Sequence, residues 1–238
     1  MNNNEKEALE YLVELGQDNE KSIRIGGQVY THLNLKRVLL PSVEPIILHT
    51  LDSFIAFYKD TEGWDSDCFP MFVHIEDATT VKLIGPVRDD SSREVYAIVK
   101  AELPREISYG SFSDTENFNI NLQSRFVDND DKKLLLKFTG LVKEENVKQT
   151  GDDGISQAIV IKTGVASVGQ AVVPNPVKLA PWRTFQEVPQ PESLFVFRMK
   201  DGPTAALFEA DGGAWRLEAI KNIKEYLETA LDAVVILA

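Results

Sequence analysis

Histidine, a residue type often used in catalysis, occurs only three times in this chain, as His32, His49 and His74. His74 and Glu76 stand two apart on a predicted strand, so their side chains share a face, and the H-x-E spacing is found in zinc deaminases. Those sites also need a P-C-x-x-C pair, but the single cysteine, Cys68, lies upstream. No G-x-S-x-G elbow supplies a serine nucleophile for a histidine base. We therefore expect a half-exposed strand pair here and no metal ion.

Acidic clusters are the other source of metal ligands. Asp128-Asn129-Asp130 begins like a calcium loop, but Lys132 stands where the fifth position needs an oxygen ligand. Asp152-Asp153-Gly154 and Asp211-Gly212-Gly213 could hold paired carboxylates, although turn formation by Asp and Gly explains both. No glycine-rich turn ends in Lys-Ser or Lys-Thr, so the chain has no phosphate loop. We expect no cofactor and no catalysis.

Arginines and aromatic residues accompany one another in the second half of the chain. These are Arg183, Arg198 and Arg216 together with Trp182, Phe185, Phe195, Phe197 and Trp215. Proteins that bind single-stranded nucleic acid use this mixture, because the rings stack on bases and the cations neutralise phosphates. Core aromatics beside arginines whose stems cover apolar surface give the same composition. The sequence leaves both interpretations open.

A proline-rich stretch lies within this half. Five of the eleven prolines fall between Pro174 and Pro191, so the segment can be neither a helix nor a central strand. Its apolar side chains, among them Val177 and Val188, are too many to stay in water. We expect an extended arm that lies on a neighbouring molecule. The residues predicted to make interactions are Pro176, Leu179, Trp182, Arg183, Phe185, Arg198 and Trp215.

The elements that must position these residues show both helical and strand periodicity. Apolar spacing predicts helices over 5–15, 51–59, 115–126, 132–142 and 214–231, of which 115–126 also alternates as a strand would. Period-two patterns predict strands over 69–76, 80–84 and 94–102, an antiparallel meander, and further strands over 156–162, 168–173 and 233–237. A hairpin or a bulge is expected around Gly26-Gly27, and a hairpin around Asp201-Gly202-Pro203. These patterns predict an α+β fold of antiparallel sheets with flanking helices and a proline-rich extended segment.

The length of 238 residues fits one large domain or two small ones. We expect a single α+β unit over 1–238. The polar stretch 143–154 is the best candidate for a subdomain boundary, since it ends in a run of Gly and Asp. It would separate an acidic N-terminal part, 1–145, from a C-terminal part, 150–238.

The charge of the chain excludes some partners. It has 25 basic and 37 acidic residues, a formal net charge of −12, and residues 1–119 hold 11 of the basic and 21 of the acidic residues. Duplex phosphates and anionic lipid repel such a chain. A single cysteine, a polar N-terminus and the lack of a long apolar run predict a cytoplasmic protein with no membrane partner.

Several motifs resemble those of a known family. They are Asp152-Asp153-Gly154-Ile155-Ser156-Gln157, Lys162-Thr163-Gly164, the run from Asn175 through Trp182-Arg183-Thr184-Phe185 to Phe197-Arg198, and Leu207-Phe208-Glu209-Ala210-Asp211-Gly212-Gly213 with Trp215. In these motifs the chain resembles the YfdQ-like group of bacteriophage and prophage proteins, whose function is unknown. The resemblance extends upstream through Leu51-Asp52-Ser53-Phe54, Phe72-Val73-His74 and 118–126 and so covers most of the chain. It implies a phage or prophage origin, expression in the bacterial cytoplasm and a role outside the virion, but no reaction.

Our first hypothesis is a non-enzymatic phage-type protein that self-associates or binds a host or phage protein. The alternative is an accessory protein in phage replication, recombination or evasion of host defence, which binds single-stranded nucleic acid or mimics the acidity of DNA. Duplex nucleic acid is the less expected partner. An enzymatic role based on His74, Glu76 and the Asp-Gly turns is the least favoured.

Overall fold

Two compact units make up the chain, Met1–Pro41 and Ser42–Ala238. The computed structural model describes residues 3–19, 23–25, 28–30, 41–60, 70–89, 91–141, 147–152, 157–163, 167–172, 175–200, 204–231 and 234–238. The expected single α+β unit with a possible boundary near 143–154 stays a prediction. Residues on both sides of 143–154, such as Leu135 and Leu179, are buried in the same core.

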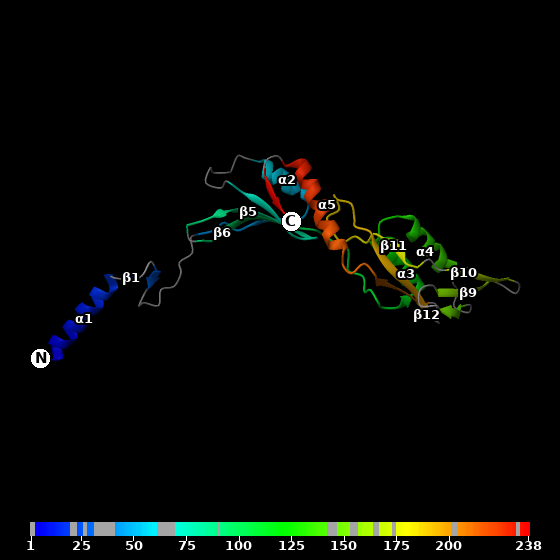
Figure 1. Ribbon diagram of the computed structural model, residues 1–238, viewed down its shortest axis with the longest axis horizontal. Coiled ribbons are helices and arrows are strands. Elements are labelled where there is room, and N and C mark those ends of the chain that lie inside the picture. Colours follow the sequence, from blue (N-terminus) through cyan, green and yellow to red (C-terminus); the bar gives the residue numbers. More distant parts are fainter. Residues whose placement is uncertain are drawn as a thin grey trace. The chain divides into compact units, whose positions relative to one another are not determined.

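The first unit contains α1 (Asn3–Asn19) and the antiparallel pair β1 (Ile23–Ile25) and β2 (Gln28–Tyr30), seen in blue in Figure 1. The predicted helix and hairpin are thus confirmed, while Gly26-Gly27 lies outside the described residues. Leu9, Leu12 and Val13 of α1 remain 51–66% exposed.

The second unit begins with a five-stranded sheet in the order β14-β4-β5-β6-β3. Its centre is the predicted antiparallel meander of β4 (Phe72–Asp77), β5 (Thr80–Val87) and β6 (Arg93–Lys100). Both edge strands, β3 (Ile46–Leu48) and β14 (Val235–Leu237), pair in parallel with their neighbours. The sheet is therefore mixed, and β3, which directly follows Pro45, was not predicted.

Two helices cover one face of this sheet. Alternate strand residues face inward, since successive side chains point to opposite faces; they are Val73, Ile75, Val81, Leu83, Ala97 and Val99. Against them pack α2 (Leu51–Lys59) and α5 (Trp215–Ala230), which lie side by side in Figure 1. Thr50 caps α2, because its side chain accepts a hydrogen bond from Ser53 N. Both helices were predicted from their apolar spacing.

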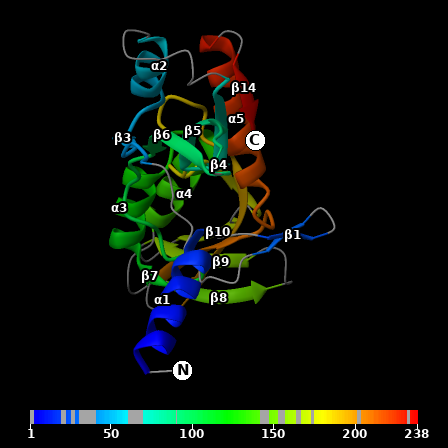
Figure 2. The same ribbon diagram turned by 90° about the vertical axis from the view of Figure 1, so that its left-hand side faces the viewer.

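A second core lies on a four-stranded sheet in the order β11-β12-β13-β7. The predicted hairpin forms β12 (Ser193–Lys200) and β13 (Thr204–Glu209), flanked by β11 (Val177–Leu179) and β7 (Ser113–Asp114). Two further helices, α3 (Thr115–Arg125) and α4 (Asp130–Leu141), pack side by side over it (Figure 2). Asp114 caps α3 by accepting from Asn117 N at 2.8 Å, which resolves the ambiguity of 115–126 in favour of a helix.

A separate antiparallel sheet has the order β10-β9-β8. Strands β9 (Gln157–Thr163) and β10 (Ser167–Val172) match the predicted strands. Strand β8 (Val147–Asp152) falls in the stretch that we expected to be a boundary. It was not predicted, because only one of its six residues, Val147, is apolar. The fold is α+β, and none of the helices among the described residues is long and apolar enough to cross a membrane.

The proline-rich segment packs within its own chain. Val177 and Leu179 are fully buried in the core under α3 and α4, and Phe185 and Val188 are buried in the core under α2 and α5. Glu187 adds a polar contact, because its Oε1 accepts from Leu51 N at 2.7 Å at the start of α2. The expectation of an arm on a neighbouring molecule is therefore wrong for these side chains: the segment joins the two cores.

Candidate functional site

A cavity of about 400 Å³ in the second unit gathers arginines and aromatic rings. Its charged walls are Arg105, Glu106, Arg125, Arg183, Glu209 and Arg216, and its rings are Tyr109, Trp182 and Trp215. Leu103, Pro104, Ile107 and Pro181 add apolar surface. We call this the arginine–tryptophan cavity.

Arg183 lies deepest among these arginines and is only 8% exposed. Its guanidinium stacks on Trp215, with 4.6 Å between Cζ and the ring centroid, and lies 5.4 Å from the Phe195 centroid and 5.8 Å from that of Tyr109. Nη1 donates to Oε1 of Glu209 at 3.0 Å. Cation–π contacts of this kind stabilise a desolvated cation. The rings and one carboxylate thus hold a buried positive charge.

The ionisation of the buried groups follows from this packing. Burial lowers the pKa of Arg183, although the neighbouring Glu209 raises it in part. Burial raises the pKa of Tyr109 to about 12, despite the nearby Arg183. Tyr109 is consequently a neutral hydroxyl at physiological pH, and Arg183 stays charged because guanidinium pKa values start so high.

Gln190 fixes the backbone around Arg183. Its Oε1 accepts from the backbone N–H groups of Arg183 at 2.9 Å and Thr184 at 3.2 Å. Its Nε2 donates to the carbonyls of Phe185 at 2.8 Å and Val188 at 3.2 Å. One amide side chain therefore closes the loop that carries Arg183.

Trp215 and Arg216 are positioned by the turn that starts α5. Asp211 accepts from Ser193 Oγ at 2.6 Å and from Gly213 N at 3.0 Å. Gly213 has φ +82°, and a Cβ there would come within 2.5 Å of Arg216 Nη1. The missing side chain lets Arg216 lie back over the turn, with Cζ 4.9 Å from the Trp215 centroid. The Asp-Gly turn thus serves structure, as its composition suggested.

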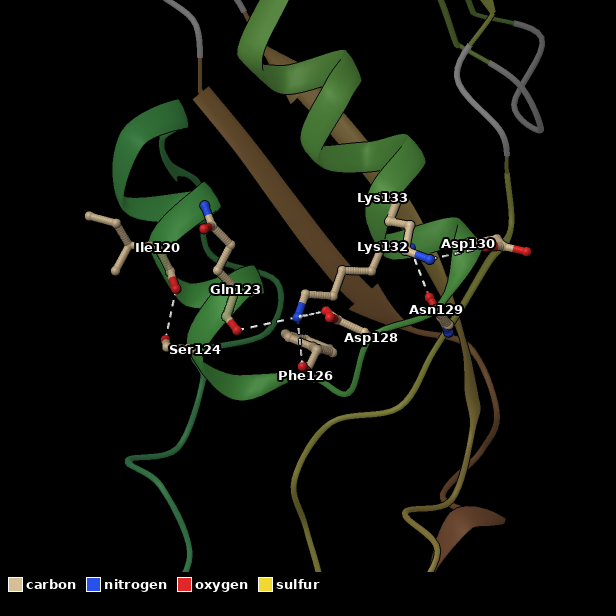
Figure 3. A network of polar contacts seen from close by, with 9 residues as sticks. All are labelled: Ile120, Gln123, Ser124, Phe126, Asp128, Asn129, Asp130, Lys132 and Lys133. Carbon is tan, nitrogen blue, oxygen red and sulfur yellow. Dashed lines mark hydrogen bonds and ion pairs between the residues drawn. The ribbon is translucent and has the colours of Figure 1, made fainter.

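The end of α3 positions Trp182 and Arg125. Trp182 N donates to Arg125 O at 3.0 Å, and Val127 N donates to Ala180 O at 2.8 Å. This short antiparallel contact is itself anchored by Lys132, shown in Figure 3, whose Nζ donates to the Phe126 carbonyl at 2.8 Å.

Lys132 also bonds to two further oxygens at this helix end. Its Nζ donates to the Gln123 carbonyl at 3.2 Å and to Asp128 Oδ1 at 2.7 Å (Figure 3). Lys132 is only 4% exposed, so it takes the place of water at the C-terminus of α3. The residue that ruled out a calcium loop here caps a helix.

The segment between β6 and β7 forms another wall of the arginine–tryptophan cavity. Tyr109 packs its ring 5.3 Å from that of Phe195, and Gly110, with φ +76°, donates its N–H to Leu207 O at 2.8 Å. Arg125 Nη1 donates to the Glu106 carbonyl at 3.1 Å and ties this segment to α3. Arg105 and Glu106 are held at the cavity by these contacts.

The cavity is positive within an acidic chain. Four arginines face two glutamates there. Among the described residues, Arg183 is the one of the four that forms an ion pair. Arg105, Arg125 and Arg216 therefore present positive charge that no described carboxylate neutralises.

Three of the predicted interaction residues meet in this cavity: Trp182, Arg183 and Trp215. Leu179 and Phe185 do not, because each is buried in a different core, and this corrects their assignment as contact residues. The remaining two lie elsewhere: Pro176 is exposed, and Arg198 is half-buried, with Nη1 donating to Phe197 O.

Sequence reasoning missed Arg105, Tyr109 and Arg125. They come from the acidic half and from the end of α3, far along the chain from Arg183. Arg105 follows Pro104 in a stretch that belongs to no helix or strand and has no periodic signal, so only the tertiary structure brings it to the tryptophans.

The catalytic candidates are dispersed. Glu76 forms an ion pair with Lys82, and His49 Nδ1 lies 3.6 Å from Glu102, while His74 is half-buried in β4. Within the part of the chain that the structure describes, no three His, Cys, Asp or Glu residues are placed to hold a metal ion. Cys68, His32 and Asp153-Gly154 lie outside the described residues.

Comparisons with family models, curated proteins and solved structures found no match to this chain. The resemblance to the YfdQ-like group stays a prediction.

Proposed function

We propose that this protein binds single-stranded nucleic acid non-catalytically through the arginine–tryptophan cavity. The observation that carries the proposal is the meeting of two half-buried tryptophans with four arginines, three of them without a described ion pair, in one cavity. A base can stack on a half-buried indole such as that of Trp182, while Trp215 already carries the guanidinium groups of Arg183 and Arg216, and arginines can neutralise the neighbouring phosphates. The phage-type setting and cytoplasmic location expected from the sequence belong to the same proposal.

The test is binding of a fluorescently labelled oligothymidylate, measured by anisotropy at low salt. Arg216→Ala should weaken binding, because it removes an exposed cation of the cavity. Trp182→Ala should weaken it by about 1–3 kcal/mol, the typical loss of one base–aromatic stack. Lys137→Ala is the matched control, since Lys137 is exposed on α4 and does not line the cavity.

The control should bind as the unaltered protein does. If the three variants bind equally well, or if the unaltered protein binds no oligothymidylate, the proposal is wrong.

A second candidate function is binding of a protein partner by α1, as in our first sequence hypothesis but through a different segment. Its observation is the exposed row of Leu9, Leu12 and Val13. The helix contains five acidic residues and one lysine, so the complementary partner is an apolar groove with a basic rim. Self-association is the other possible outcome.

Affinity capture from a bacterial lysate after nuclease treatment tests this candidate, with light scattering to give the mass in solution. Leu12→Ser should release the captured protein or lower the mass. Leu217→Ser, at a leucine 74% exposed on α5, is the control. Identical behaviour of both variants and the unaltered chain would contradict a role for α1.

A further inference from the structure

One edge of the Arg183 guanidinium has no hydrogen-bond acceptor among the described residues. Glu209 accepts a hydrogen bond from Nη1. Nε and Nη2 are buried and have no hydrogen-bond partner among the described residues. These two nitrogens form one side of the guanidinium fork, and their parallel N–H groups match two oxygens of a single phosphate or carboxylate. A buried donor without an acceptor is unfavourable, so a pair of ligand oxygens that reached this edge by a small shift of the cavity wall would stabilise it.

The burial of Arg183 favours a small, doubly charged group. Arg183 is 8% exposed, Arg125 is half-buried, and Arg105 and Arg216 are exposed. A phosphate monoester carries close to two negative charges at neutral pH, whereas a phosphate within a strand carries one. The monoester, having three terminal oxygens, can meet the free edge and still face a second arginine.

The rings place a base beside that phosphate. Trp215 stacks on the Arg183 guanidinium, and Trp182, the next residue to Arg183, is half-buried at the same cavity. The buried arginine thus lies within one nucleotide of a stacking surface.

We propose that Arg183 binds a terminal phosphate monoester, so that the cavity takes the phosphorylated end of a single strand. This inference rests on the proposed function, and it adds that the end of the strand, and not its interior, occupies the cavity.

The experiment compares oligothymidylates of one length with a 5′-phosphate, a 3′-phosphate or hydroxyls at both ends, using the full chain. At least one phosphorylated form should bind about tenfold or more tightly than the hydroxyl form, as expected for charge-assisted bonds to two oxygens. Arg183→Lys keeps the charge but lacks the fork, so it should remove most of this difference. Arg198→Lys, outside the cavity, should retain it.

A measurement on the unaltered protein guards against misfolding of Arg183→Lys. The second ionisation of a phosphate monoester has a pKa near 6, so the preference should shrink as the pH falls from about 7.5 to about 5.5. Thymidine monophosphate and inorganic phosphate, added as competitors at constant ionic strength, show whether the strand is needed beside the phosphate.

The outcomes separate the two proposals. Equal binding of all three oligonucleotides overturns the terminal-phosphate inference and leaves single-strand binding standing. Binding of the monophosphate, but of no oligonucleotide, supports the phosphate site and overturns the strand as its ligand. Binding of none of these probes overturns both.

Discussion

Lys132 shows what a charged side chain can do when it is buried beside a helix end. Its ammonium group satisfies two backbone carbonyls, and its one carboxylate partner, Asp128, is 80% exposed. The contact therefore owes more to hydrogen bonding than to a buried ion pair.

Lys132→Met keeps the side-chain length and removes the ammonium group. The Gln123 and Phe126 carbonyls then lose their donor, and the free energy of unfolding should fall by about 1–3 kcal/mol. The measurement is the urea concentration at which half of the protein is unfolded, compared between variants whose unfolding free energy depends on urea with the same slope. Lys133→Met, at a neighbouring lysine 67% exposed, should stay within about 0.5 kcal/mol of the unaltered protein. Equal stability of the two variants would contradict the capping role.

Asp211 links stability to pH. Burial alone would raise the pKa of Asp211, but hydrogen bonds from Ser193 and Gly213 and the charge of Arg183 lower it below its ordinary value. The folded state thus binds this proton less readily than the unfolded chain does. The stabilisation is present above about pH 4, the ordinary pKa of aspartate, and is lost as the pH falls through the lower folded value.

Asp211→Asn should therefore be less stable than the unaltered protein near neutral pH, and the gap should narrow below about pH 4. Urea midpoints across this range measure it. A gap that stays constant to low pH would show that Asp211 does not contribute through its charge.

The proline-rich segment forms only one short strand, β11, yet its side chains contribute to both cores. Its closing contact is Gln190, whose amide holds both ends of the Arg183 loop. Replacing 174–191 by a neutral linker would remove buried side chains from two cores, so the change would disturb folding before it tested any association.

Gln190→Ala is the sharper change. It leaves the N–H groups of Arg183 and the fully buried Thr184 without their acceptor, and we expect a loss of about 2–4 kcal/mol from two such groups. Oligothymidylate binding should weaken with it, because Arg183 is no longer held. Gln186→Ala, at an exposed position of the same segment, should change neither property. Thermal unfolding and anisotropy report the two effects.

At the element scale, the sequence correctly predicted the helices and strands whose apolar residues recur with a clear period. The meander, α2, α5 and the hairpin of β12 and β13 all follow from apolar spacing. It failed for β3 and β8, where short length or few apolar residues leave no period to read. It also predicted that Val177 and Phe185 must be covered, but burial inside the same chain depends on contacts between distant segments, which no local pattern reveals.

For the whole molecule, the net charge of −12 and the positive cavity act at different ranges. The global charge repels a nucleic acid at distances within the screening length, about 10 Å at 0.1 M salt, whereas the arginines act on phosphates in contact. A rigid duplex brings many phosphates against the acidic surface, while a flexible single strand can enter the cavity alone. This difference would let an acidic chain prefer single strands, as we propose.

The dependence of the binding affinity on salt measures the contribution of the contacts between arginines and phosphates. With three arginines free of described ion pairs, the slope of log affinity against log salt should be about −2 for a single strand, or about a 20-fold loss between about 50 and 200 mM. Duplex of the same sequence should bind far more weakly throughout. A slope near zero, or a preference for duplex, would contradict this account.

The placement of the tryptophans has a practical consequence. Of the three in the chain, Trp182 and Trp215 line the cavity, and Trp64 lies outside the described residues. Two of the three indoles of this protein therefore belong to the walls of its own candidate site. The unlabelled molecule carries a built-in optical reporter, whose quenching or spectral shift would register an occupant of the cavity in a single cuvette.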